Sequence, residues 1–338
     1  MITVRENIDL KTFNTFGIQA RCDRWIDYTE TSDIPEITKR YGAGKLLSIG
    51  GGSNLLFTRD FHGTIIHSRI TGLKITNKGA VHTATIGAGE RFDSVIERCC
   101  DDGLWGIENL SGIPGDTGAA AVQNIGAYGV EIKDVIETVD CFDTLTGKFR
   151  TLTCDDCGYG YRSSIFKNSD HRFIVTAITV RLNEKPSPRL EYAGLNSLSE
   201  TGIRLTPHRV REEIIRLRDT KLPDPATIGN AGSFFKNPVL SAEEYDLFLK
   251  SAGGSGYTDI PHYDTPQGTK IPAAWLIEQS GFKGRITGNA GVWHKQPLVL
   301  INATGHATGQ DITNLENEII QSVYKNFGIH LHPEVEHI

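Results

Sequence analysis

One stretch of this 338-residue chain carries almost no side-chain bulk: Leu110 to Glu131, LSGIPGDTGAAAVQNIGAYGVE. It holds five glycines, four alanines and two carboxylates. Glycine tolerates positive φ and lets another backbone or a phosphate approach closely. The composition is typical of a cradle for a phosphate-bearing ligand, and equally of a small-residue seam between two packed layers. The choice between these interpretations depends on the rest of the chain.

Length and charge narrow the class of protein. A chain of 338 residues is too long for one comfortable core, so two or three domains are expected. The net charge of −6 disfavours nucleic acid or an anionic membrane as the main partner, because both require a basic surface. The N-terminus lacks the pattern of a secretory leader, and no run reaches the roughly eighteen apolar residues of a membrane span. We therefore expect a cytoplasmic protein.

The six cysteines do not form a metal-finger pattern. Cys154-Asp-Asp-Cys157 is the one C-x-x-C pair, and a single pair cannot complete a tetrahedral zinc site. A redox couple stays open, although incidental cysteines are the favoured interpretation. His330, His332 and His337 near the C-terminus lack the carboxylate–histidine spacing of a metal site, so no metal is expected.

A second glycine cluster follows a buried strand expected at 46–49. That strand leads directly into Gly50-Gly51-Gly52-Ser53-Asn54-Leu55. A strand that ends in three glycines indicates either a ligand loop or a simple turn. The cluster lacks the Lys-Ser/Thr of a P-loop and the G-x-G-x-x-G spacing of a Rossmann turn.

Hydrophobic periodicity predicts a mixed order of strands and helices. Strands are expected at 63–67, 81–86, 135–143, 173–182 and 298–302, and helices at 92–100, 207–219, 273–281 and 312–327. We expect Asp311 to cap the last helix and Gly328 to close it. The prolines within 184–188 indicate a linker and a domain boundary.

Two further motifs carry polar side chains that could take part in binding or catalysis. In YRSSIFK, the Arg162 guanidinium could clamp a carboxylate or phosphate, or could be a solvated side chain. In GNAGSFFKNP, small residues leave Ser233 accessible, and the two aromatics after it are expected to keep water away. A nucleophilic serine is disfavoured, because the G-x-S-x-G pattern requires glycine where Phe235 stands. Ser233 is better interpreted as a proton donor, or as a serine in a turn.

Five motifs together resemble the UDP-N-acetylenolpyruvoylglucosamine reductase family. They are GGGSNLL (50–56), IPGDTGAAAVQNIGAYGVE (113–131), YRSSIFK (161–167), GNAGSFFKNP (229–238) and HPEVE (332–336). The resemblance implies an α+β protein with the vanillyl-alcohol-oxidase, or PCMH-type, FAD-binding fold. In that fold two α/β subdomains hold FAD and a third, α+β domain binds the substrate. The implied parts are 1–70, 71–205, 206–310 and a C-terminal helix and tail at 311–338, with the FAD-binding region at about 17–183.

The resemblance also implies a reaction. NADPH would deliver a hydride to FAD, which would then reduce UDP-N-acetyl-3-O-(1-carboxyvinyl)-glucosamine to UDP-N-acetylmuramate in peptidoglycan precursor synthesis. Ser233 would donate the proton, while Arg162 and Glu334 would polarise the substrate carboxylate and stabilise the enolate. The implied partners are the UDP-sugar and NADPH, with no nucleic acid and no membrane, and we expect a monomer.

The implied binding residues follow from matching the motifs position by position. The implied FAD contacts are Gly50, Gly51, Gly52, Ser53, Asn54, Leu55, Ser111, Gly112, Ile113, Pro114, Gly115, Gly118, Ala119, Gln123, Asn124, Gly126, Ala127, Tyr128 and Gly129. The implied substrate contacts are Tyr161, Arg162, Lys167, Tyr192, Lys221 and Asn237. Tyr192 and the chain length resemble the type I branch, in which a tyrosine closes over the nucleotide. The sequence Tyr192-Ala-Gly-Leu195 departs from the Tyr-Gly-Asp-Leu often found there.

Two other classes of protein fit part of this pattern. An FAD-dependent oxidase of a free sugar or alcohol would share the flavin subdomains. Such enzymes need a base and often a His or Cys flavin tether, and neither glycine-rich stretch contains His or Cys. A non-catalytic UDP-sugar-binding protein would keep the fold but would not need Arg162, Ser233 and Glu334. Bound flavin that NADPH bleaches separates an enzyme from such a binding protein.

Overall fold

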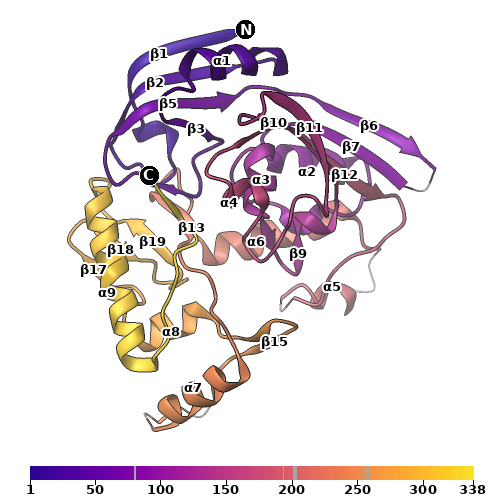
Figure 1. The fold of residues 1–338 in the computed structure, drawn as a ribbon. Helices are drawn as coiled ribbons and strands as arrows, with labels where there is room; N and C mark the ends of the chain where they lie inside the picture. Colours follow the sequence, from indigo (N-terminus) through magenta and orange to yellow (C-terminus); the bar gives the residue numbers. More distant parts are fainter. Residues whose placement is uncertain (80, 193, 201–203, 255, 258) are drawn as a thin grey trace. The chain divides into compact units, whose positions relative to one another are not determined.

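The computed structural model describes residues 1–79, 81–192, 194–200, 204–254, 256–257 and 259–338. The chain divides into two compact units. Unit 1 comprises residues 1–8, 21–52 and 61–219, and unit 2 comprises residues 9–20, 53–60 and 220–338. Both units contain helices and strands (Figure 1), which confirms the α+β class. The finer division into four parts stays a prediction.

Unit 1 contains two main sheets and the helices that pack on them. Its strands are β1 (Ile2–Asp9), β2 (Arg21–Tyr28), β3 (Leu46–Ile49), β5 (Phe61–Ser68), β6 (Leu73–Lys78), β7 (Val81–Gly87), β8 (Gly126–Ala127), β9 (Val130–Glu131), β10 (Ile136–Asp143), β11 (Lys148–Thr153) and β12 (Phe173–Asn183). Its helices are α1 (Ile34–Tyr41), α2 (Phe92–Asp101), α3 (Thr117–Gln123), α4 (Ile165–Asn168), α5 (Ser197–Glu200) and α6 (Pro207–Lys221). The first sheet has the order β1-β2-β5-β3, with β5 parallel to both β2 and β3. The second, β11-β10-β12-β7-β6, is antiparallel throughout.

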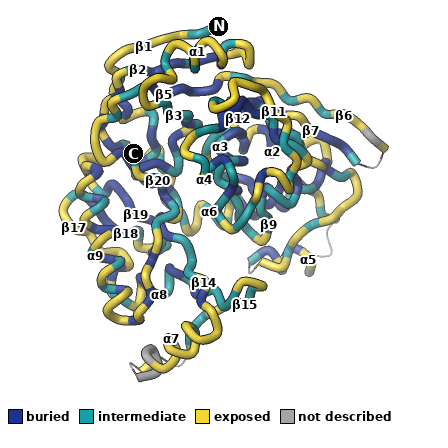
Figure 2. Tube along the Cα trace, in the orientation of Figure 1, coloured by how far each residue is buried: buried dark blue, intermediate teal, exposed yellow. Residues whose placement is uncertain are grey.

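The predicted helix at 92–100 is confirmed as α2, and its apolar face lies in the largest core of unit 1. Phe92, Val95, Ile96 and Cys99 share one buried cluster with side chains of β7, β10 and β12. Figure 2 shows that β12 is buried along most of its length. The i, i+3, i+4, i+7 spacing predicted this face because those positions align along one side of a helix.

One carboxylate ties α2 to the glycine-rich stretch and to α6. Asp93 on α2 accepts a hydrogen bond from the backbone N–H of Gly112 at 2.6 Å. It also accepts from the guanidinium of Arg211 on α6, with Nη2 3.0 Å from Oδ2. Burial by itself would raise the pKa of Asp93, but the hydrogen bonds from Arg211 and Gly112 hold it below its usual value. The carboxylate is therefore an ionised link between three segments.

Five of the six cysteines are buried, and Cys154 is partly buried. All six are free thiols, and Cys157 is buried. Burial raises the pKa of Cys157 to about 12, which keeps it protonated and unreactive. The predicted preference for incidental cysteines over a redox couple at Cys154 and Cys157 agrees with this environment.

The described residues of unit 2 form short strands and α-helices. Its strands are β4 (Leu55–Leu56), β13 (Asn230–Ser233), β14 (Val239–Leu240), β15 (Tyr263–Thr265), β16 (Gly268–Lys270), β17 (Ile286–Thr287), β18 (Ala290–Val292), β19 (Val299–Asn302) and β20 (Glu336–His337). Its helices are α7 (Ala242–Gly254), α8 (Ala273–Gln279) and α9 (Gly309–Phe327). Three sheets have the orders β13-β19-β18-β17, β14-β16-β15 and β20-β4. Among the residues that the structure describes, no helix is both long and apolar enough to cross a bilayer.

Helix α9 confirms the predicted apolar stripe and corrects its predicted start. The N-cap is Thr308, so the prediction of Asp311 as the cap is wrong. The Thr308 hydroxyl accepts from the Asp311 N–H at 3.1 Å, and Asp311 Oδ2 accepts from the Thr308 N–H at 2.8 Å. This reciprocal pair is a capping box, in which the acidic residue occupies the third helical position. Gly328 closes the helix with φ +70°, as predicted.

We predict that replacing Asp93 with Ala lowers the free energy of unfolding by roughly 3 kcal/mol, measured by denaturant titration. The variant leaves the buried Arg211 guanidinium, whose side chain is 6% exposed, without its carboxylate partner.

The matched control is Asp101→Ala, which removes a second ion pair between the same two helices. Asp101 contacts His208, and both side chains are more than half exposed. Exposed pairs of this kind contribute less than about 1 kcal/mol. Equal losses in the two variants would contradict a special role for Asp93.

Candidate functional site

In unit 1 the two glycine-rich stretches meet backbone to backbone. A Cβ built on Gly51 would lie 3.2 Å from the Cα of Gly115, and one built on Gly50 would lie 3.0 Å from the Cβ of Ala119. We call this contact between 50–52 and 115–119 the glycine junction. Such a surface lets backbone N–H groups approach a diphosphate closely, so these residues fit the expected FAD. It is also a close-packed seam, so that interpretation of the glycine composition is confirmed, and the ligand cradle stays a prediction.

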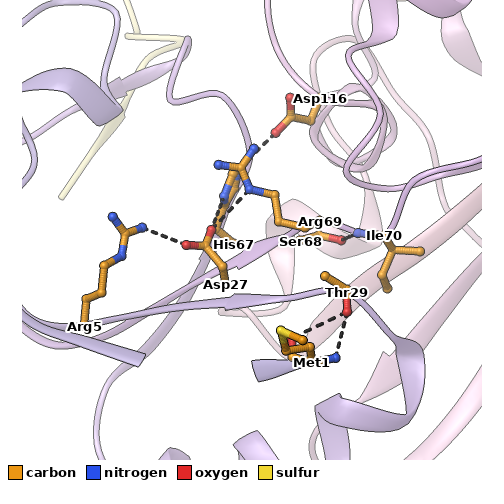
Figure 3. Close-up of polar contacts among 9 residues, drawn as sticks. All are labelled: Met1, Arg5, Asp27, Thr29, His67, Ser68, Arg69, Ile70 and Asp116. Carbon is orange, nitrogen blue, oxygen red and sulfur yellow. Dashed lines mark hydrogen bonds and ion pairs between the residues drawn. The ribbon is translucent and has the colours of Figure 1, made fainter. Parts of the chain in front are cut away.

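A histidine lies between two carboxylates at the glycine junction (Figure 3). His67 Nδ1 is 2.9 Å from Asp27 Oδ1, and its Nε2 is 3.3 Å from Asp116 Oδ2. Asp27 also accepts from Arg5 Nη2 at 2.7 Å. The Asp116 carboxylate lies beside Gly50, where an added Cβ would be 3.3 Å from Oδ2. The chain of contacts fixes a carboxylate against the predicted cofactor loop.

Sequence analysis missed this group because its members are far apart in the chain. His67 follows Asp27 by 40 residues and precedes Asp116 by 49. Asp27 and His67 are register partners in the parallel pairing of β2 with β5. A register of this kind depends on the whole sheet and leaves no local signal.

A second missed residue is Arg218, near the end of α6. A Cβ built on Gly112, whose φ is +72°, would lie 2.9 Å from Arg218 Cδ and Nε. Burial lowers the pKa of Arg218 from its usual value, which marks a poorly hydrated cation. Its spacing of four from Ile214, on the buried face of α6, is a signal that could have found it. A guanidinium here could hold an anionic group of a ligand.

Several predicted cofactor residues have their side chains engaged within unit 1. Asn124 is fully buried with φ +45°, and its Nδ2 donates to Glu131 Oε2 and to the Gly160 carbonyl. The Ser111 hydroxyl donates to the Glu108 carbonyl at 2.6 Å. These side chains shape the glycine-rich stretch, so any ligand contact from them would come through the backbone.

Arg162 is held in a conformation that few non-glycine residues adopt. Its φ is +53°, and its Nη2 donates to the Gly126 carbonyl at 2.7 Å. A Cβ on Gly126 would lie 2.9 Å from Arg162 Nη1, so a larger residue there would displace the guanidinium. The guanidinium also lies 5.5 Å from the ring centroid of Tyr161. Strained residues persist where the surrounding structure fixes them, and such residues cluster at functional sites.

The other predicted substrate residues of unit 1 lie in two places. Lys167 Nζ donates to Gln123 Oε1 at 2.8 Å, which joins a predicted substrate residue to a predicted cofactor residue. Tyr192 packs edge-on against Tyr128 with centroids 4.9 Å apart, and it is 43% exposed. Residue 193 of the Tyr192-Ala-Gly-Leu195 segment lies outside the described residues.

In unit 2 the structure brings Ser233 and Glu334 onto adjacent backbone segments. The Glu334 N–H donates to the carbonyl of Phe234, the residue after Ser233, at 2.7 Å. The Lys236 N–H donates to the His332 carbonyl at 2.9 Å on the same pair of segments. The GNAGSFFKNP and HPEVE motifs, about a hundred residues apart in the chain, are thus neighbours within one unit.

The end of the GGGSNLL motif contacts the segment that carries Glu334. Strand β20 pairs in parallel with β4, and the Glu336 N–H donates to the Asn54 carbonyl at 3.0 Å. Asn54 Nδ2 donates to the Glu334 carbonyl at 3.3 Å. Asn54 therefore orients the tail that carries Glu334, a role that its prediction as a cofactor contact did not include.

The aromatics after Ser233 do not cover it. Phe234 and Phe235 are 0% and 1% exposed in the core of unit 2, while Ser233 itself is exposed. The expectation that these rings keep water from Ser233 is wrong. Both rings are buried in the core, and they leave the Ser233 side chain exposed.

Lys221 and Asn237 also belong to unit 2. Lys221 ends α6 with an exposed side chain, and its carbonyl accepts from Trp293 Nε1 at 3.0 Å. Asn237 Oδ1 accepts from the Ala273 N–H at 2.9 Å, at the start of α8. Their predicted roles in substrate binding stay predictions.

Two protein-family models match separate regions of the chain. Residues 29–153 match the model of an FAD binding domain. Residues 224–338 match the model of the C-terminal domain of UDP-N-acetylenolpyruvoylglucosamine reductase.

Comparison with individual proteins extends the match to the whole chain. A UDP-N-acetylenolpyruvoylglucosamine reductase of Porphyromonas gingivalis W83 is 46% identical over 99% of this chain and 99% of the relative. One of Aliivibrio fischeri is 42% identical over 97% of this chain and 93% of the relative. The crystal structure of UDP-N-acetylenolpyruvylglucosamine reductase from Thermus caldophilus has a TM-score of 0.70 and 23% identity, and the match covers 100% of this chain and 99% of that one. At that identity, the last likeness supports the fold alone.

We predict that Gly51→Ala weakens FAD binding tenfold or more. Its Cβ would meet the Gly115 backbone and force the glycine junction apart, and overpacking of this kind costs about 1–3 kcal/mol. Titration of apoprotein with FAD, followed by flavin fluorescence, measures the change.

Gly44→Ala is the matched control, because a Cβ at Gly44 meets nothing within 4 Å. It should bind FAD like the unaltered protein, and both variants should be folded by circular dichroism. Unchanged affinity in a folded Gly51→Ala protein would exclude the junction as the FAD cradle.

Proposed function

This chain belongs to the UDP-N-acetylenolpyruvoylglucosamine reductase family, and on that premise we propose which residues carry its reaction. The protein is a flavin-dependent oxidoreductase that uses NADPH. It reduces UDP-N-acetyl-3-O-(1-carboxyvinyl)-glucosamine to UDP-N-acetylmuramate in peptidoglycan precursor synthesis. The roles of individual residues below are our proposal.

When bound, FAD supplies hydride transfer from NADPH to the terminal carbon of the enolpyruvyl double bond. The chain's first contribution is to hold the cofactor at the glycine junction, where glycine backbone replaces side-chain bulk. Arg218, buried beside Gly112, supplies positive charge near the same stretch. Asp116, fixed by His67, stiffens the loop on which this backbone lies.

The second contribution is a proton. Hydride addition at the terminal carbon leaves negative charge on the neighbouring carbon and on the carboxylate beyond it, and that carbon must be protonated. We assign this proton to the Ser233 hydroxyl, which is exposed at the end of β13. The observation that carries the assignment is the 2.7 Å hydrogen bond from the Glu334 N–H to the Phe234 carbonyl, which sets Glu334 beside the serine segment.

The third contribution is charge stabilisation. Arg162 would bind the substrate carboxylate, because its planar fork matches two carboxylate oxygens. Its backbone strain and its bond to Gly126 hold the guanidinium in place before substrate arrives. Glu334 would stabilise the enolate form of the same group by donating a hydrogen bond, which requires its carboxyl group to carry the proton. A single preorganised donor of this kind contributes roughly 3–4 kcal/mol to the transition state.

The proposal also covers substrate binding, oligomeric state and cellular location. Tyr161, Lys167, Tyr192, Lys221 and Asn237 would contact the UDP-sugar, and the lysines would offset its negative charge in a chain of net charge −6. We propose that the protein acts as a monomer. We propose a cytoplasmic location, where NADPH and nucleotide sugars are available.

Ser233→Ala tests the central assignment. We expect NADPH to reduce the bound flavin at an unchanged rate, since no carbon is protonated in that half-reaction. Reoxidation of the flavin by the UDP-enolpyruvyl sugar should slow by about 10²–10⁴-fold, the range of a lost general acid. Anaerobic stopped-flow absorbance measures both half-reactions separately.

Ser233→Thr keeps a hydroxyl and serves as the conservative control, with a sugar half-reaction much closer to that of the unaltered protein. Full speed in Ser233→Ala would remove Ser233 from the role of proton donor. In the unaltered protein, flavin that oxygen reoxidises while the sugar does not would instead favour an oxidase of the same fold.

A further inference from the structure

The last eight residues of the chain are anchored at several points of unit 2. The Glu334 N–H bonds to the serine segment through the Phe234 carbonyl. Beyond it, the Thr58 N–H and hydroxyl both donate to the Ile338 carbonyl at 2.9 Å. Terminal residues fray unless they are held in this way. The position of Glu334 therefore depends on contacts made by the residues that follow it.

One of these contacts is made between side chains. His337 Nε2 lies 2.7 Å from Glu316 Oε2, and the Glu316 side chain on α9 is only 7% exposed. A buried carboxylate requires a hydrogen-bonding or charged partner, because its desolvation is otherwise uncompensated. Glu316 interrupts the predicted apolar stripe of α9 between Leu315 and Ile319. The penultimate residue of the chain supplies the partner that explains this interruption.

The same imidazole also contacts the serine segment. The rings of His337 and Phe234 meet edge to face, with centroids 6.0 Å apart at 88°. Phe234 directly follows Ser233 and is completely buried. His337 thus links a rigid helix, through Glu316, to the core residue adjacent to the proposed proton donor.

We propose that His337 is a positioning residue for the protonation half of the reaction: its pair with Glu316 fixes the tail so that Glu334 stays beside Ser233. This inference rests on the proposed roles of Ser233 and Glu334. The NADPH half of the reaction needs neither residue and should not depend on the pair. Because a displacement of about 1 Å in a catalytic group can cost 10²-fold in rate, loss of the anchor should be visible in the rate of one half-reaction only.

The pair also gives that half-reaction a dependence on pH. The hydrogen bond that His337 donates to the Glu316 carboxylate raises the pKa of His337 above its ordinary value near 6.5, and the backbone of Val335 adds to the effect. Glu316 on α9 is the charged group that faces the imidazole, while β4 offers Leu56 and the serine segment offers Phe234. A raised pKa means that the charged pair is complete below pH 6.5 and is lost as the pH rises through the higher folded-state value.

The test compares both half-reactions of the FAD-loaded protein by anaerobic stopped flow between pH 6 and 9. In His337→Phe, flavin reduction by NADPH should stay within twofold of the unaltered protein. Flavin reoxidation by the UDP-enolpyruvyl sugar should slow by about 10–100-fold at pH 6, mainly in its limiting rate at saturating sugar. The difference between His337→Phe and the unaltered protein should shrink as the pH rises.

A double variant separates anchoring from folding. Glu316→Gln with His337→Gln replaces the ionic pair by two amides that can still hydrogen-bond, so the protein should fold. Its sugar half-reaction should be faster than that of His337→Phe and should lose the inflection assigned to His337. A retained inflection would assign it to another group and overturn the proposal.

His330→Phe is the matched control, because it removes an exposed histidine seven residues earlier and should leave both half-reactions unchanged. Ser233→Ala, measured in parallel, separates the two hypotheses. If Ser233→Ala slows the sugar half-reaction and His337→Phe does not, the anchoring role fails and the proposed function stands. If Ser233→Ala has no effect, the proposed role of Ser233 as the proton donor fails, and the anchoring role that rests on it fails with it. Equal slowing of both half-reactions by His337→Phe would reduce the pair to a structural contact.

Discussion

The glycine-rich stretch of unit 1 depends on the hydrogen bonds that the Asp93 carboxylate accepts. This carboxylate holds the N–H of Gly112 at one end of the glycine-rich stretch and the Arg211 guanidinium of α6 at the same time. A stretch with so many glycines loses more backbone entropy on folding than any ordinary loop, so it cannot hold a shape by itself. Side chains outside the stretch must provide the order. The same anchor lets α6 present Arg218 against Gly112.

In unit 2, a buried side-chain amide helps to order the glycine-containing segment before Ser233. The side chain of Asn302 donates to the Phe16 carbonyl at 3.0 Å and accepts from the Ala307 N–H at 2.9 Å. Gly229 then packs so closely on the Phe16 carbonyl that a Cβ could not be accommodated. The Thr15 hydroxyl completes the brace by donating to the Asn230 carbonyl at 2.6 Å. The segment before Ser233 is thus held by Thr15 and Phe16, which lie near the N-terminus.

The sequence predicted what short-range periodicity determines. Helices α2 and α9 and strand β12 were found at their positions because 3.6-residue and two-residue repeats place apolar side chains on one face. The cap of α9 was misplaced because T-x-x-D offers two polar candidates, and the apolar stripe begins only after the second. The contacts that assemble the candidate site have no such local signal. Asn54 meets Glu334 across 280 residues, and this pairing depends on how β4 and β20 align.

The proposed site residues divide between the two units, and their proposed roles divide in the same way. The glycine junction, with Asp116 and Arg218, belongs to unit 1, whereas Ser233 and Glu334 belong to unit 2. Substitutions at the junction should therefore act first on cofactor binding, and substitutions around the tail should act on proton delivery. Arg162 is the exception, because it lies in unit 1 but is proposed to bind the substrate carboxylate. Its strained backbone and its bond to Gly126 connect it to the same stretch that forms the junction. Order imposed on that stretch by Asp93 consequently extends to the cation proposed to bind the substrate, so cofactor and substrate sites share one source of rigidity.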